Sequence, residues 1–71
     1  MIMTEQIRVK LQEAIKQSDM TQNELAERIG VIQQSVAQYL SGRALPSLST
    51  FANICAVLDL DANEILCIAD Y

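Results

Sequence analysis

The 71-residue chain contains no histidine and no tryptophan, and only one proline, two glycines and two cysteines. Histidine is the commonest general base in enzymes, so its absence argues against a catalytic site. Two thiols alone are too few ligands for a structural zinc site, and we interpret Cys55 and Cys67 as small buried hydrophobic residues. The scarcity of glycine and proline, with 51% hydrophobic residues, predicts compact helices and not disorder. We therefore expect a non-enzymatic, all-α protein without a metal or another cofactor.

Long apolar segments are also missing. No run approaches the ~18 residues of a membrane span, and Met1 to Glu5 lack the layout of a signal peptide. We therefore expect a cytoplasmic protein without a membrane partner, forming one domain over residues 1–71. A chain of this size buries only about 60% of the surface that it exposes when unfolded. Its core is modest, and dimerisation is one way to stabilise it.

Basic residues are scarce, with five lysines and arginines against nine acidic residues and a net charge of −4. This balance argues against a nucleic-acid ligand unless the acidic residues are segregated. Residues 31–50 carry Arg43 as their only charge, whereas residues 51–71 carry four acidic residues and no basic one. The central stretch is therefore close to neutral. Few basic groups still predict weak non-specific DNA binding with a shallow salt dependence.

Residues 21–40 carry the signals of two short helices joined by a turn. Thr21 followed by Glu24 predicts a capping box, in which each side chain satisfies a backbone N–H at a helix start. Gly30 ends the first helix where a left-handed residue is needed, and Ala26 allows the second helix to pack closely. Two helices joined by a turn of about three residues that contains glycine form a helix-turn-helix.

Neutral polar side chains dominate the start of the second helix, namely Gln33, Gln34, Ser35 and Gln38. No acidic residue occurs from 31 to 40, although solvated helix faces usually carry glutamate and lysine. Glutamine can form two hydrogen bonds to adenine in the major groove, which contributes roughly 1–3 kcal/mol of base discrimination. These amides therefore indicate base recognition. The alternative is an ordinary polar surface on a helical hairpin.

Three sequence runs carry a family resemblance. They are Thr-Gln-x-Glu-Leu-Ala-x-x-x-Gly-Val from Thr21, Gln-Gln-Ser-Val-x-Gln-Tyr-Leu-Ser-Gly-Arg from Gln33, and Pro-Ser-Leu from Pro46. Together they resemble the helix-turn-helix of the lambdoid phage repressor and Cro proteins, the XRE family, over about residues 5–68. The resemblance implies a compact five-helix, lambda-repressor-like DNA-binding domain with its helix-turn-helix at about residues 21–40.

The resemblance also implies roles for individual residues. Gln22 is expected to contact the DNA backbone and to brace Gln33. Ser41 and Arg43, at the end of the second helix and in the following loop, are expected on phosphates, while Gln33, Gln34 and Gln38 read base edges. The implied partner is a double-stranded, near-palindromic operator bound by a homodimer, with no small-molecule ligand evident.

Ile32 departs from the family pattern, which usually has serine or threonine at the cap of the recognition helix. Losing such a cap typically costs about 1 kcal/mol. The isoleucine either presents a methyl surface to a thymine or packs inward, leaving another group or water to cap the helix.

The first helix is predicted from Glu5 to about Gln17, capped by Thr4, with Arg8, Glu13 and Lys16 facing water. A fourth helix is capped by Ser47, and Phe51 is expected at the centre of the core. Its core-facing stripe is predicted to consist of Leu48, Phe51, Ile54, Cys55 and Leu58.

The last helix is predicted from about residue 62 to residue 68, after Asp61, which with Glu64 forms its acidic start. It is apolar on more than one face. The second face indicates a partner, and in the resembled family this end commonly forms the dimer interface. We therefore expect Ile65, Leu66 and Ile68 at a homodimer interface. The alternative is a frayed end with incidental apolar residues.

Two other functions fit the same fold. One is a protein-interaction module, such as an antitoxin or antirepressor, which the acidic total and the sparsely basic loop favour and the glutamines oppose. The other is a DNA-binding part of a larger regulator.

Overall fold

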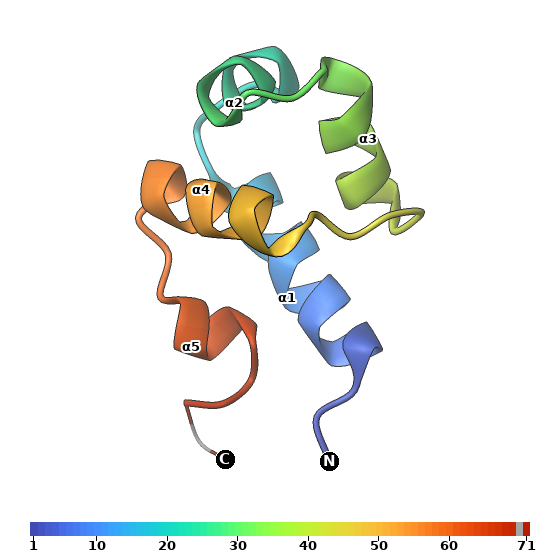
Figure 1. The fold of residues 1–71 in the computed structure, drawn as a ribbon, viewed down its shortest axis with the longest axis vertical. Coiled ribbons are helices and arrows are strands. Elements are labelled where there is room, and N and C mark those ends of the chain that lie inside the picture. The colour runs from blue at the N-terminus through green and yellow to red at the C-terminus, as the bar shows by residue number, and fades with distance from the viewer. Residues whose placement is uncertain (70) are drawn as a thin grey trace.

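The computed structural model describes residues 1–69 and 71 (Figure 1). These residues form five α-helices and no strand, which confirms the predicted all-α fold. The helices are α1 (Thr4–Gln17), α2 (Gln22–Ile29), α3 (Gln33–Ser41), α4 (Leu48–Leu58) and α5 (Ala62–Ile65). None of the described helices is long and apolar enough to cross a membrane.

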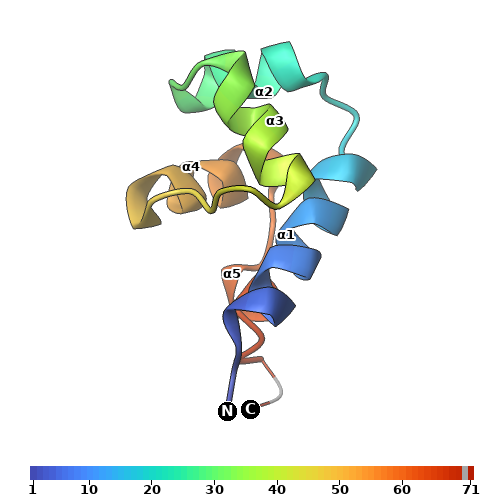
Figure 2. The ribbon, with the colours of Figure 1, turned by 90° about the vertical axis from the view of Figure 1, so that its right-hand side faces the viewer.

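The helices are arranged along an axis of 33 Å (Figure 1). The helices α2 and α3 lie together at one end of the molecule. At the other end are α5 and both chain termini, and α1 and α4 connect the two ends (Figures 1 and 2). The helix-turn-helix and the predicted dimer interface therefore occupy different ends of the molecule.

The start and end of α2 follow the prediction. The backbone N–H of Glu24 donates to Thr21 Oγ1 at 3.1 Å, and the N–H of Thr21 donates to Glu24 Oε1 at 3.3 Å. Gly30 ends the helix with φ of 76°, a left-handed conformation that glycine adopts without steric cost. The buried Ala26 confirms the close packing expected at this helix.

The predicted starts of the other helices are confirmed in part. Ser47 caps α4 by accepting from the N–H of Thr50 at 3.3 Å, and Asp61 caps α5 by accepting from the N–H of Asn63 at 3.0 Å. The cap predicted at Thr4 is wrong. Thr4 is already the first residue of α1, so it does not occupy the cap position. Met3 occupies that position, and its N–H donates to the side chain of Gln6.

The prediction that the last helix reaches residue 68 is also wrong. α5 ends at Ile65, and the chain then turns through Leu66 and Cys67, which has a left-handed φ of 63°. The N–H of Ile68 donates to the Asn63 carbonyl across this turn. A left-handed residue cannot continue a right-handed helix, which explains the early end.

The core lies where four helices meet. Its most deeply buried side chains are Leu11, Leu25, Val36 and Ile54, one from each of α1 to α4. Phe51 is buried but retains 8% exposure, so it lies at the edge of the core and not at its centre. Leu48 is 85% exposed, which contradicts its predicted core position. As the first residue of α4 it extends beyond the elements that cover Phe51 and Ile54.

Candidate nucleic-acid interface

The outer face of α3 is polar, and its inner face anchors it in the core. Val36 and Tyr39 are buried, whereas Gln33 and Gln34 are exposed. Ser35, Ala37 and Gln38 are partly exposed. Figure 2 views the molecule from the side on which α3 lies in front of the other helices. The predicted base-reading amides therefore lie on an uncharged helix that is open along its outer side.

The N-terminal ends of α2 and α3 are joined by their side chains. Gln33 Nε2 donates a hydrogen bond to Gln22 Oε1. This contact confirms the bracing expected from the family resemblance. It fixes the orientation of the Gln33 amide and leaves its Oε1 and its second N–H free to meet a base edge.

The start of α3 has no side-chain cap. Ile32 occupies the N-cap position with no side-chain hydrogen bond, and the N–H of Ser35 donates instead to the Ile32 carbonyl at 3.0 Å. The Ile32 side chain is 67% exposed, so it does not pack inward. The inward packing considered from the sequence is therefore wrong, and a contact of the Ile32 methyl groups with a thymine stays a prediction.

The end of α3 turns sharply into an exposed loop. Gly42 has φ of 82°, and the N–H of Arg43 donates back to the Gln38 carbonyl at 3.0 Å. The Ser41 hydroxyl donates to the same carbonyl at 3.1 Å, and both Ser41 and Arg43 are exposed. The loop therefore presents the Arg43 side chain immediately after the recognition helix, as the sequence predicts.

Two residues of α1 that were not predicted to belong to this region lie against the end of α3. Gln12 Nε2 donates to the Leu40 carbonyl at 2.9 Å, and the Arg8 side chain lies beside Gly42. The prediction that Arg8 faces water is therefore wrong in part, because its side chain is only 27% exposed. Spacing along α1 places Arg8 and Gln12 on one face, but nothing in the sequence shows that this face meets α3.

The comparisons with known proteins agree with this geometry. A family model described as helix-turn-helix matches residues 11–65, which is most of the chain. The chain belongs to the Cro/C1-type helix-turn-helix family. This family consists of DNA-binding regulator domains that are generally non-enzymatic. No curated protein and no solved structure matches the chain.

Membership of the Cro/C1-type family supports DNA binding by this chain, and the polar face of α3 is the candidate surface. This helix-turn-helix protein carries only one charged residue, Arg43, between residues 29 and 58. The polar side chains of this stretch are therefore mostly neutral hydrogen-bonding groups. The roles of the single residues Gln22, Gln33, Gln34, Ser35, Gln38, Ser41 and Arg43 remain predictions.

The residues predicted at the dimer interface differ in their exposure. Ile65 is 7% exposed and belongs to the core of its own chain. Leu66 is half-buried and packs against that core, whereas Ile68 is 46% exposed. Only Ile68, and the outer part of Leu66, are open to a partner in this structure.

Both cysteines are free thiols. Burial raises the pKa of the Cys55 thiol, and the nearby Asp61 carboxylate raises that pKa further. The thiol therefore stays protonated and unreactive at neutral pH, which fits its place in the core. Within the described residues, no group of three or more potential side-chain ligands could hold a metal ion.

Proposed function

We propose that this protein is a transcriptional repressor that binds a specific double-stranded DNA operator as a homodimer. The observation that supports this proposal most directly is the hydrogen bond from Gln33 to Gln22, at the exposed start of an uncharged recognition helix. A braced amide needs little reordering when it meets a base edge, so its hydrogen bonds contribute to discrimination. Repression would follow from occupation of a promoter by the protein. We place the protein in the bacterial cytoplasm, bound to the nucleoid.

The proposed contacts divide into two kinds. Gln33, Gln34 and Gln38 read base edges in the major groove, and Ser35 lies between them on the same helix. Gln22 retains its own N–H groups for a phosphate, because only its Oε1 is used by Gln33. It also lies in the first turn of α2, where the helix dipole favours an anion. Ser41 and Arg43 position the other end of α3 on the backbone.

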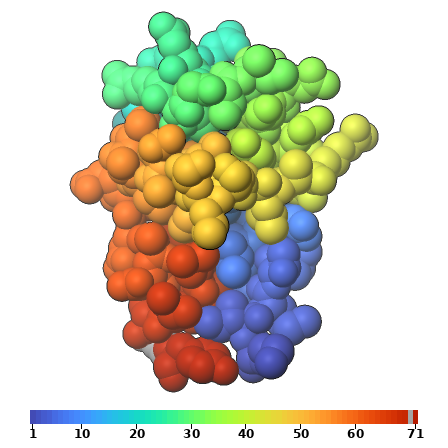
Figure 3. Space-filling model, viewed as in Figure 1, coloured from blue at the N-terminus to red at the C-terminus, as the bar shows by residue number. Residues whose placement is uncertain are grey.

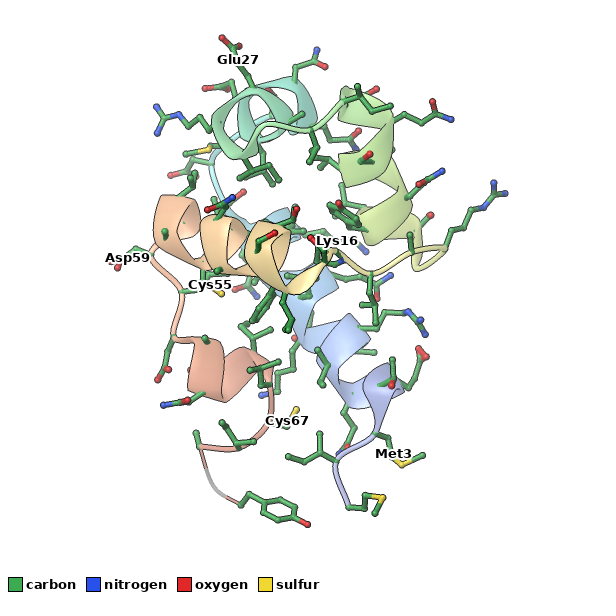
Figure 4. All side chains as sticks on the ribbon, viewed as in Figure 1. Met3, Lys16, Glu27, Cys55, Asp59 and Cys67 are labelled. Carbon is green, nitrogen blue, oxygen red and sulfur yellow. The ribbon has the colours of Figure 1, made fainter. Side chains whose placement is uncertain are left out.

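The end of the molecule that holds both termini supports a homodimer. The exposed apolar residues at this end are Met1, Met3, Val9, Ile68 and Tyr71, and the two terminal segments lie side by side there (Figure 3). Met3 and Cys67 are found at the same end in Figure 4.

Selection from a pool of random duplex DNA tests this function. The protein is expected to enrich a near-palindromic site whose half-sites are about one helical turn apart. A variant in which Gln33, Gln34 and Gln38 are all replaced by alanine serves as the control and should enrich no site. Failure of the wild type to enrich any sequence would overturn the proposal.

A second candidate function, binding to a protein partner, is favoured by an acidic groove between α1, α5 and the loop before α5. Its volume is about 630 Å³. Its lining includes Glu13, Asp59, Asp61 and Glu64 against the single basic residue Lys10. A surface of this charge suits a basic protein partner and not DNA. If the protein binds only a protein partner, the selection from random duplex DNA should enrich no palindromic site.

A further inference from the structure

Three polar residues of α1 form a stripe that leads to the end of the recognition helix. Glu5, Arg8 and Gln12 are three and four residues apart, a spacing that places them on one face of a helix. Gln12 Nε2 donates to the Leu40 carbonyl at 2.9 Å. Figure 2 shows α1 running beneath the C-terminal end of α3 on the side from which α3 is viewed. The stripe therefore borders the α3 face proposed to bind DNA.

The Arg8 side chain is held at this border by its own packing. A Cβ atom placed on Gly42 would lie 3.3 Å from Arg8 Cδ and 3.9 Å from its Nε. The arginine stem therefore fills the space that the glycine leaves open. This contact fixes the guanidinium close to the loop that carries Arg43, so two cations flank the end of α3.

The hydrogen bonds of Arg8 are incomplete. Its Nη1 donates to Glu5 Oε2 at 2.8 Å, but its Nε is enclosed and has no hydrogen-bond partner among the described residues. Buried N–H groups normally find an acceptor. The Glu5 carboxylate is 67% exposed, and a pair of this kind is stabilised little because water screens it. The guanidinium can therefore exchange Glu5 for a better anion.

We propose that Arg8 binds a DNA phosphate beside the end of the recognition helix and that Glu5 holds its guanidinium in the free protein. This inference rests on the DNA-binding function proposed above. An arginine donates two parallel hydrogen bonds to phosphate oxygens, a stronger interaction than a single exposed carboxylate provides. Because the stem is already fixed against Gly42, little side-chain freedom is lost when the phosphate replaces Glu5.

Glu5 then acts as a competitor for the phosphate. Its carboxylate occupies Nη1 of the guanidinium, and its negative charge repels a phosphate that approaches Arg8. The Glu5–Arg8 pair therefore lowers the affinity for operator and non-operator duplexes alike. Removing Glu5 alone should therefore tighten binding, and this gain should depend on Arg8.

A matched pair of variants tests the Arg8 contact. Arg8→Gln and Lys10→Gln each remove one positive charge from α1, but Lys10 lines the groove against α5 together with Glu13 and Glu64. The salt dependence of binding is measured on the duplex selected by the wild type. Arg8→Gln is expected to make the slope of log K against log salt shallower by about 0.9, the value for one phosphate contact. Lys10→Gln should keep the wild-type slope.

Equal slopes for the wild type, Arg8→Gln and Lys10→Gln would overturn the proposal, as would an equal change in both variants. Arg8→Lys retains the charge and is expected to retain the slope. If the slope becomes shallower in Arg8→Lys as well, the effect comes from the packing of Arg8 against Gly42 and not from its charge. This result would also overturn the phosphate contact. Thermal melting of each variant confirms that binding is measured on folded protein.

A second matched pair tests the role of Glu5. Glu5→Gln and Glu13→Gln each remove one negative charge from α1, but only Glu5 is paired with Arg8. Glu5→Gln is expected to bind the selected duplex more tightly than the wild type at low salt, and Glu13→Gln is expected to bind like the wild type. In the Arg8→Gln background most of the gain from Glu5→Gln should vanish. A gain that is equal in both backgrounds would contradict the competition.

The two proposals fail in different ways. If the wild type selects no duplex, the DNA-binding function itself is wrong. If the wild type selects an operator but Arg8→Gln and Lys10→Gln bind it with the same slope, only the role of Arg8 is wrong.

Discussion

Gln33 is the residue whose surroundings are best defined on the recognition helix, because a second glutamine holds its amide while its outer side stays open. Gln33→Ala is expected to weaken binding to the selected operator by about 1–3 kcal/mol and to relax the preference at one base pair of each half-site. Stability should not change, since the side chain is exposed. Competition gel shifts with single-base operator variants measure the effect.

Gln17→Ala is a suitable control for this variant, because Gln17 is also an exposed glutamine but ends α1. It should leave operator binding unchanged. If Gln33→Ala lowers the melting temperature but leaves the base preference unchanged, Gln33 has a structural role only.

The two glycines of the helix-turn-helix region offer a comparison at the same scale. Both have a left-handed φ, and an L-residue in this conformation costs on the order of 1–3 kcal/mol. An added Cβ at Gly30 would meet nothing within 4 Å, whereas one at Gly42 would lie 3.2 Å from Gln12 Nε2 and 3.3 Å from Arg8 Cδ. Gly42→Ala should therefore lower the free energy of unfolding more than Gly30→Ala does. Urea denaturation compares them, and equal losses would show that the α1 side chains yield without cost.

α3, like α1, begins at a residue whose side chain makes no capping hydrogen bond. Ile32→Thr supplies a hydroxyl that can accept from a free N–H of the first turn, and little burial is lost because Ile32 is mostly exposed. The free energy of unfolding is expected to rise by about 0.5–2 kcal/mol. Thr21→Ala, which removes the existing cap of α2, should lower it by a similar amount. An unchanged or lower melting temperature for Ile32→Thr would contradict this expectation.

Helix starts were the elements most predictable from the sequence, because a cap is a contact within three residues. Thr21 with Glu24, Ser47 and Asp61 all form the hydrogen bonds expected of them. The helix stop at Gly30 was predictable for the same reason. Thr4 failed because the neighbouring Gln6 provides a competing bond one residue earlier.

Contacts between elements were not predictable from spacing. Leu48 fits the apolar stripe of α4, yet no other element covers that end of the helix. Arg8 is spaced as a surface residue, yet the loop after α3 lies against it. The bracing of Gln33 by Gln22 was expected only from the family resemblance, because eleven residues separate the two side chains.

For the whole molecule, the apolar end with both termini is the proposed site of dimerisation. Ile68→Glu places a charge on the exposed part of this end and is expected to convert the dimer to a monomer while leaving the fold intact. Leu66→Glu should also dissociate the dimer, but it is expected to lower the melting temperature because Leu66 packs against the core. The mass in solution, measured by sedimentation, reports the outcome.

Ile32→Glu makes the same substitution at an exposed isoleucine of the helix-turn-helix end and should leave the mass unchanged. If Ile68→Glu has the mass of the wild type, the interface lies elsewhere on the molecule.

The negative charges of the molecule are distributed unevenly. Asp59 lies on the side away from α3 (Figure 4), in the same groove as Glu13, Asp61 and Glu64, while Asp70 falls outside the described residues. The phosphates of a duplex repel the acidic side more strongly than the nearly neutral reading side. If α3 is the DNA-binding face, as proposed, this difference favours encounters in which α3 points toward the duplex and disfavours those in which the groove does. The acidic residues of the groove then contribute to the orientation of the encounter, although they lower the overall attraction to DNA.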